Sequence, residues 1–269
     1  MMFRKTAWAG YGKFYQSDKK ILETELQQMV RPAENRQKVL GLLAPHAGYM
    51  YSGACAGQGY GRVVLTETVI ILGVNHRGGG PDLAVDGNDY WETPLGNVEV
   101  NSELRSRLLG VSGLFQLDSE AGRLEHSLEV QVPFIQYASP GSRILPIVVS
   151  AYRLEDLLAA GQEIAAFLKD NRNLMMVASS DMSHYVTAAR ARELDFKAIE
   201  KMLQLDAEGL YHTVRDNRIS MCGVAPAVIM LSAARAAGAS RAELVCYTHS
   251  GEVTGEMDEV VGYASLIVF

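Results

Sequence analysis

The chain has 269 residues, a formal net charge of −6, and 48% hydrophobic and 21% charged residues. This length and composition suit one large globular α/β domain. The net negative charge and the lack of a clustered run of Lys and Arg argue against nucleic acid as a partner, because neutralising phosphates requires such clusters. No apolar stretch approaches the roughly 20 residues of a membrane helix. The N-terminus has no signal-peptide pattern. We therefore expect a cytoplasmic protein without membrane contact.

Apolar runs and helical periodicities alternate along the chain. Their near-continuous hydrophobicity predicts strands that are covered on both faces of a sheet. These strands are expected at 40–44, 68–73, 143–149, 173–179, 243–248 and 262–269. Two shorter alternating runs, 82–87 and 96–101, predict an edge hairpin with a loop near Pro94. Helices are expected at 18–30, 123–138, 153–170, 191–205 and 225–238. The alternation predicts one α/β domain over residues 1–269, with a central sheet flanked by helices.

Two histidines follow the first two predicted strands directly. His46 comes after 40–44 and Pro45, and His76 comes after 68–73. Ligands of open α/β sheets bind outside the carboxyl ends of strands, so these two imidazoles and that of His184, which comes after the strand 173–179, could converge there if their strands are parallel neighbours. Either histidine alone could equally be a hydrogen-bonded loop residue. The glycines at 78–80 match no phosphate-binding motif, so a phosphate site ranks last.

The predicted helix 123–138 begins with Glu125 and His126. A carboxylate at this position is suited to the positive end of the helix dipole. His126 then lies either at the surface or near a pocket. Ser127, Glu129 and Gln131 are expected on the polar side of this helix.

The fourth of these strands, 173–179, runs into Asp181 and His184. Their spacing of three residues would place both on one face of a helix starting here. A carboxylate beside an imidazole is a pairing used in acid–base catalysis. Ser179 and Ser180 are explained as caps of the same helix.

Cys222 precedes the predicted helix 225–238, and a thiol at a helix N-terminus gains thiolate character. A small buried hydrophobe is the competing interpretation. The other two cysteines, Cys55 and Cys246, fall inside a helical and a strand pattern, and we expect both to be packing residues. The absence of a CxxC pair predicts reduced thiols rather than a disulfide framework.

Five separated motifs together resemble the Memo family, whose bacterial members are also called AmmeMemoRadiSam system protein B. In chain order they are APHAGYMYSG (44–53), ILGVNHRG (71–78), EHSLEVQVPF (125–134), SSDMSHY (179–185) and MCG (221–223). The segment AGYGKFY (9–15) resembles the opening element of that family with altered spacing. The resemblance spans roughly residues 5–269.

The resemblance implies a fold like that of the class III extradiol dioxygenases, with a mixed, mostly parallel sheet. It implies that His46 and His76 are metal ligands and that Cys222 stands where the dioxygenases have a glutamate ligand. It also implies that His184, accompanied by Asp181, is an acid–base residue. His126 and Tyr49 are possible pocket residues on the same grounds.

These implications lead to a non-haem metal-dependent oxidoreductase, dioxygenase-like, acting on an unidentified small molecule. Fe(II) is the expected metal, whereas Cu or Zn would also suit a His, His and Cys donor set. Two alternatives stay open. One is a binding or scaffold protein that keeps the pocket and acts with radical-SAM and AMMECR1-like partners. The other is a zinc hydrolase in which His184 or Asp181 is the base.

Overall fold

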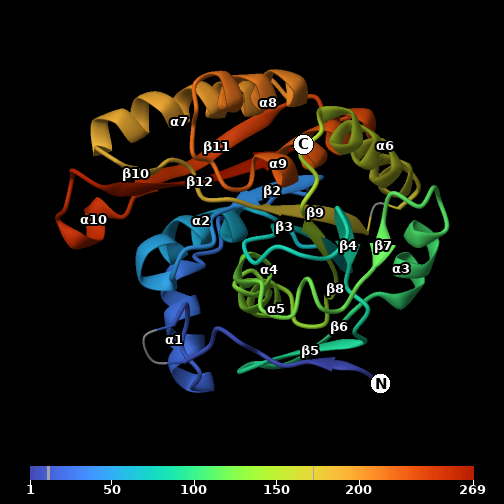
Figure 1. The fold of residues 1–269 in the computed structure, drawn as a ribbon. Helices are drawn as coiled ribbons and strands as arrows, with labels where there is room; N and C mark the ends of the chain where they lie inside the picture. Colours follow the sequence, from blue (N-terminus) through green and yellow to red (C-terminus); the bar gives the residue numbers. More distant parts are fainter. Residues whose placement is uncertain (11–12, 172) are drawn as a thin grey trace.

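The computed structural model describes residues 1–10, 13–171 and 173–269, and its centre is a nine-stranded sheet between helical layers (Figure 1). The strand order is β10-β12-β2-β9-β3-β8-β4-β7, and β11 pairs with β12. The bounds are β2 (Gly41–Ala44), β3 (Thr68–Val74), β4 (Leu83–Val85), β7 (Gln116–Leu117), β8 (Arg143–Val149), β9 (Leu174–Ser179), β10 (His184–Val186), β11 (Ala242–His249) and β12 (Val260–Val268). All six long strands expected from the apolar runs are present.

The middle of the sheet is parallel and its flanks are largely antiparallel. Strands β2, β9, β3 and β8 are consecutive parallel neighbours, with Ala44 opposite Ser179 and Leu72 opposite Ala178. β12 runs antiparallel to β2 on one side and to β11 on the other. The expected mixed sheet flanked by helices is therefore confirmed, with its parallel part concentrated in the four central strands.

The expected edge hairpin of 82–87 with 96–101 is wrong. β4 belongs to the main sheet, where it pairs antiparallel with β8, because all three of its residues are buried and need cover on both faces. The hairpin is instead formed by β5 (Tyr90–Thr93) and β6 (Gly96–Glu99). β1 (Phe3–Arg4) joins β5 to make a separate three-stranded sheet.

Two groups of helices cover the main sheet (Figure 1). α9 (Val224–Ala236) packs on β2, β3 and β9, and ten of its residues are buried, as expected of a helix that is apolar all round. α6 (Leu154–Asp170) and α8 (Ala207–Asp216) lie beside it, and α7 (Ala188–Leu203) packs against α8, β11 and β12. The second group comprises α1 (Lys19–Met29), the π-helical turn η1 (Tyr49–Gly53), α2 (Ala54–Arg62), α4 (His126–Glu129) and α5 (Val132–Ala138). α3 (Ser102–Leu109) and α10 (Gly251–Thr254) complete the elements. Within the described ranges, no helix has the length and apolar character needed to cross a membrane.

The helix expected at 123–138 is two short helices, α4 and α5, and this part of the prediction is wrong. Pro133 in the first turn of α5 has no N–H to continue the hydrogen-bond ladder from α4. The polar residues of this segment are also buried rather than exposed. Ser127, Glu129 and Gln131 are each 0% exposed, so each needs a partner inside the protein.

Candidate metal centre

The carboxyl ends of β2, β9 and β3 meet at one edge of the sheet, because the three strands are adjacent and parallel. His46 follows β2, Asp181 follows β9 and His76 follows β3. The strands expected to bring His46, His76 and His184 together are therefore parallel neighbours, and the loop after β9 leads on to His184 at the start of β10. α4 packs against β3 and brings His126 to the same place.

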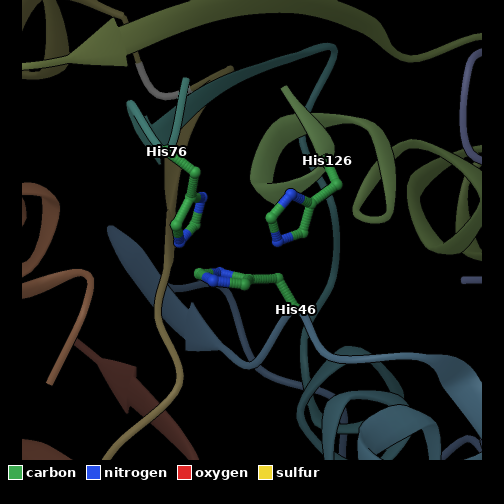
Figure 2. Close-up of side chains that lie close together, drawn as sticks. All are labelled: His46, His76 and His126. Atoms are coloured by element: carbon green, nitrogen blue, oxygen red, sulfur yellow. The ribbon is translucent and has the colours of Figure 1, made fainter. Parts of the chain in front are cut away.

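Three imidazoles form the centre of the site, and Figure 2 shows their rings turned toward one another. One ring nitrogen each from His46, His76 and His126 lies within 4.8 Å of the other two. The ring centroids are 5.3 Å apart for His46 and His76, 5.4 Å for His46 and His126, and 4.5 Å for His76 and His126. His46 is buried, whereas the other two are partly accessible. This spacing would allow the three side chains to bind one metal ion together.

Burial keeps two of these imidazoles uncharged. Burial, and then the charge of His76, lowers the pKa of His46 to about 3. Burial, and then the charge of His46, lowers the pKa of His126 to about 4. Neutral imidazole is the metal-binding form, so near neutral pH both rings have a lone pair available for coordination.

Glu125 connects α4 to the second histidine. It is the N-cap of α4 and accepts a hydrogen bond from Ser127 N at 2.9 Å, in agreement with the expected place at a helix N-terminus. Its carboxylate also accepts from His76 N at 2.8 Å and lies 2.9 Å from His76 Nδ1. Burial raises the pKa of Glu125, but the bonds from His76 and Ser127 outweigh it and lower the pKa to about 2.

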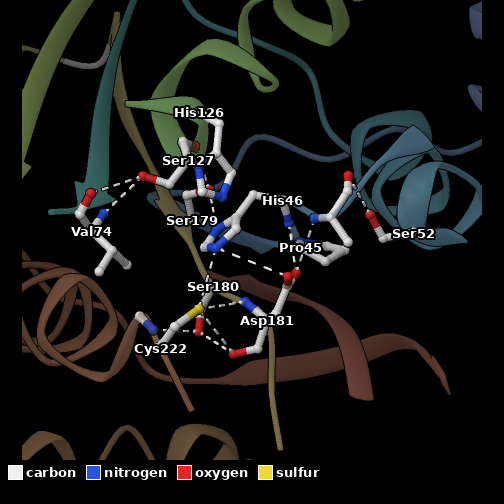
Figure 3. Close-up of polar contacts among 12 residues, drawn as sticks. Pro45, His46, Ser52, Val74, His126, Ser127, Ser179, Ser180, Asp181 and Cys222 are labelled. Carbon is white, nitrogen blue, oxygen red and sulfur yellow. Dashed lines mark hydrogen bonds and ion pairs between the residues drawn. The ribbon is translucent and has the colours of Figure 1, made fainter. Parts of the chain in front are cut away.

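Ser179 makes the corresponding contact with the first histidine. His46 Nδ1 lies 3.0 Å from Ser179 Oγ, at the end of β9 (Figure 3). Neither Ser179 nor Ser180 caps a helix, so that interpretation is wrong. The residues that follow are irregular and lead into strand β10. No signal in the local sequence separates such a buried serine from a helix cap.

Cys222 lies beside His46, in the turn before α9. Its Sγ is 3.2 Å from His46 Nε2 and 3.3 Å from Asp181 N, which donates to the sulfur (Figure 3). Burial and then the negative charge of Asp181 raise the pKa of the thiol. The expected thiolate character is thus contradicted for the metal-free protein. The group of three mutually close ligand atoms in the described residues contains His126 and not Cys222.

Asp181 and His184 do not share a helix face, because His184 begins strand β10. Asp181 Oδ1 accepts hydrogen bonds from the backbone N–H groups of His46 (2.7 Å) and Ala47 (3.3 Å), and it therefore fixes the loop after β2. His184 Nδ1 lies 2.9 Å from the carbonyl oxygen of Ser220. Since a carbonyl only accepts, this ring nitrogen donates, and Nε2 is the atom left free in neutral His184.

Aromatic side chains from the N-terminal segment cover His126. The ring of Phe14 lies 4.4 Å from His126 and that of Trp8 lies 5.9 Å from it, centroid to centroid. The Arg77 guanidinium is 4.9 Å from the Trp8 ring. Sequence reasoning missed these two aromatic residues, which lie far from His126 in the chain. Tyr11 and Gly12, which belong to the AGYGKFY segment, lie outside the described residues.

Tyr49, the other possible pocket residue, is buried at the start of η1. Its hydroxyl donates to the carbonyl oxygen of Val130 at 2.6 Å. Its ring stacks on Tyr15 at 5.4 Å and tilts against Phe134 at 4.7 Å. These contacts give it a packing role between η1 and the α4–α5 junction.

The residues present fit a transition-metal ion. Three imidazoles with a thiol at hand are a donor set suited to iron, copper or zinc. His126 Nδ1 is buried and, in the described part of the chain, has no hydrogen-bond partner. Both His46 and His76 have a polar partner at Nδ1, the outer contact that metal-ligating histidines commonly make.

Sequence comparisons with known proteins agree on one family. A family model described as "Memo-like protein" matches residues 4–267. A MEMO1 family protein of Methanosarcina barkeri is 42% identical over 260 residues, covering 96% of this chain and 97% of the relative. One from Aquifex aeolicus is 41% identical over 270 residues, covering 99% of each chain. The crystal structure of an uncharacterized protein from Escherichia coli K12 is similar in fold, with a TM-score of 0.52 and 15% identity over 84% of this chain and 98% of that one.

Proposed function

Because this chain belongs to the Memo family, we propose that its strand-end cluster is a metal centre serving a dioxygenase-like oxidoreductase. The observation that carries the proposal is the convergence of three histidine ring nitrogens within 4.8 Å. His46, His76 and His126 hold the metal, and Cys222 is the adjoining donor. Fe(II) is the proposed metal, since three protein ligands would leave positions on it for O2 and substrate.

The side chains around the centre have separate tasks. Cys222 Sγ lies 3.2 Å from His46 Nε2 and 3.6 Å from the carbonyl oxygen of Asp181, so the thiol lies beside the Nε2 atom of His46. Loss of the thiol proton on metal loading would make the sulfur available as a ligand. His184 is the acid–base residue: Ser220 accepts from its Nδ1, so Nε2 is the atom that takes or gives the substrate proton.

The first prediction concerns metal binding. Anaerobic titration of the wild type with Fe(II) should give one tight equivalent by elemental analysis, and His46→Ala and His76→Ala should each lose it. His212→Ala, on α8, is the matched control and should bind as the wild type does. If both His46→Ala and His76→Ala bind Fe(II) as the wild type does, the proposed metal centre is wrong.

The third donor is identified by substitution with Co(II). A thiolate ligand adds a charge-transfer band in the near ultraviolet, and this band should be present in the wild type and absent in Cys222→Ala. His126→Ala should keep the band and bind Co(II) more weakly. If His126→Ala binds with unchanged affinity, the centre consists of His46, His76 and Cys222 alone.

The second prediction concerns turnover. The Fe(II)-loaded protein should consume O2 with a panel of catechols, and His184→Ala should lower kcat by about 10²- to 10⁴-fold, the usual contribution of one acid–base group. Metal content should be unchanged in this variant. Uptake by His184→Ala at the wild-type rate would remove His184 from the mechanism. Absence of turnover with every substrate, in a protein that co-purifies with a partner, would favour the scaffold function instead.

A further inference from the structure

The hydroxyl of Ser179 has three polar neighbours that together dictate its role. Ser179 Oγ lies 2.6 Å from the carbonyl oxygen of Ser127, 2.8 Å from Gln131 Nε2 and 3.0 Å from His46 Nδ1. A carbonyl oxygen only accepts, so the single hydroxyl proton of Ser179 goes to Ser127. An amide nitrogen only donates, so Gln131 Nε2 donates a hydrogen bond to Ser179 Oγ. His46 therefore meets Ser179 Oγ as a donor, with its proton on Nδ1.

The orientation of the Gln131 amide is itself fixed by its surroundings. Its Nε2 donates to the carbonyl oxygen of Pro45 at 3.0 Å, and its Oε1 accepts from the Tyr60 hydroxyl at 3.0 Å. Exchanging the amide oxygen and nitrogen would place two oxygens against each other at Pro45. All these groups are buried, so an unpaired member would be costly. The network consequently admits one proton arrangement at Ser179.

The second histidine is held in the same way by another group. Glu125 Oε2 accepts from His76 N at 2.8 Å, and Oε1 accepts from Ser127 N at 2.9 Å. Both carboxylate oxygens are thus acceptors of backbone N–H groups. His76 Nδ1, at 2.9 Å from Oε1, is a further donor to the carboxylate. His76 therefore also has its proton on Nδ1.

We propose that Ser179 and Glu125 are positioning residues that lock His46 and His76 in the Nδ1–H tautomer. The Nε2 lone pairs of both, that of His46 facing the Cys222 thiol at 3.2 Å, are then the ones presented to a metal. The inference rests on the proposed metal centre for its purpose, whereas the tautomers themselves belong to the metal-free protein. One buried segment, 125–131, serves both histidines. It supplies Glu125, the Ser127 carbonyl that takes the Ser179 proton, and Gln131.

The tautomers can be read directly in the metal-free protein. Long-range ¹H–¹⁵N spectra of the imidazoles at near-neutral pH distinguish a protonated from an unprotonated ring nitrogen. In the wild type, His46 and His76 should each show a protonated Nδ1 and a bare Nε2, with assignment by the two single alanine variants. A protonated Nε2 on either residue overturns the inference for that residue.

Removal of each positioning group should release its histidine and weaken metal binding. Ser179→Ala should move His46 toward a mixture of tautomers and raise the Zn²⁺ Kd by about 10- to 100-fold in competition with a chromophoric chelator. Ser265→Ala is the matched control. Ser265 is an equally buried serine that donates to the Cys55 carbonyl oxygen at 2.8 Å, away from the cluster. The Ser265→Ala variant should keep the wild-type tautomers of both histidines and the wild-type Kd for Zn²⁺.

Glu125→Asp provides a second variant that keeps a helix cap and the charge. The shorter side chain withdraws from His76 Nδ1, so the His76 tautomer should become mixed and the Zn²⁺ Kd should rise by a similar factor. Unchanged tautomers in both variants would overturn the positioning role. The metal centre can fail while the tautomer assignment holds. A wild type that shows the expected tautomers but binds neither Zn²⁺ nor Fe(II) would have this result.

Discussion

At the scale of single residues, Glu129 connects the N-terminal segment to the site. It is 0% exposed and forms an ion pair with Arg4 at 2.8 Å. It also accepts hydrogen bonds from the hydroxyls of Thr6 and Tyr15 and from the backbone N–H of Trp8. Because these residues flank the aromatic cover of His126, one buried carboxylate determines where that cover lies.

Stability should depend on the charge of Glu129. Burial raises its pKa, but Arg4 and the hydrogen bond from Thr6 outweigh burial, so the folded-state pKa lies below the usual value. A lowered folded pKa means that the unfolded chain binds more protons in this window. The contribution of Glu129 is complete above the unfolded pKa of about 4.3 and is lost as pH falls through the folded pKa.

We therefore expect urea unfolding to give a free energy that declines on acidification through this window, more steeply in the wild type than in Glu129→Gln. Glu120→Gln is the control, because Glu120 is exposed and pairs with Arg123 at the surface. Equal pH slopes in the wild type and Glu129→Gln would mean that the Arg4 pair contributes no such dependence.

The proposed metal ligands were easier to foresee than the residues that orient them. His46 and His76 follow apolar strands, and a parallel sheet must bring such positions together. Glu125, Ser179 and Gln131 have polar side chains whose sequence context suggests caps or an exposed helix face. Only the tertiary packing that buries segment 125–131 turns them toward the histidines, and no local periodicity encodes it.

At the scale of elements, α2 is a helix whose glycines permit a close approach. A Cβ at Gly57 would overlap the Met29 carbonyl oxygen, and one at Gly61 would overlap that of Arg31. The backbone just after α1 therefore lies directly against α2. A helix with bulkier residues at these positions could not pack there.

Gly57→Ala should consequently destabilise the protein, although alanine is the better helix former by about 1 kcal/mol. Overpacking against main-chain atoms costs about 1 to 3 kcal/mol, so we expect a net loss of up to about 2 kcal/mol in chemical denaturation. Gln58→Ala, on the exposed face of the same helix, should change stability by less than about 0.5 kcal/mol. A gain of stability in Gly57→Ala would contradict the close approach.

Long elements with one clear period were predictable, whereas short ones were not. α6, α7 and α9 follow their apolar spacing, and β3 and β8 follow their apolar runs. The break at Pro133 and the transfer of β4 to the main sheet depend on which partners lie beside them. Such partners are far away in the sequence and leave no mark in the local pattern.

At the scale of the whole molecule, a metal at the strand ends would tie α4 to the loops after β2 and β3 and, through Cys222, to the turn before α9. A ligand that binds only the folded state at 100 times its Kd adds about 2.7 kcal/mol. For large domains each kcal/mol moves Tm by about 2 to 4 °C. We expect saturating Zn²⁺ to raise Tm by about 5 to 10 °C in calorimetry. The double variant His46→Ala, His76→Ala should show no rise, and an equal rise there would locate the stabilising ion elsewhere.

The position of β2 in the sheet has a consequence for biosynthesis. Residues 41–44 pair on one side with 176–179 and on the other with 266–268. During synthesis, β2 cannot pair until β9 and β12 have been made. Forming these pairs closes long loops, which is slow. Metal delivered before residues 260–268 have emerged from the ribosome would find histidines on an incomplete sheet. If the proposed centre holds a metal, we therefore expect it to assemble only after synthesis is complete, and an early stop in β12 should prevent assembly without removing any of the proposed ligands.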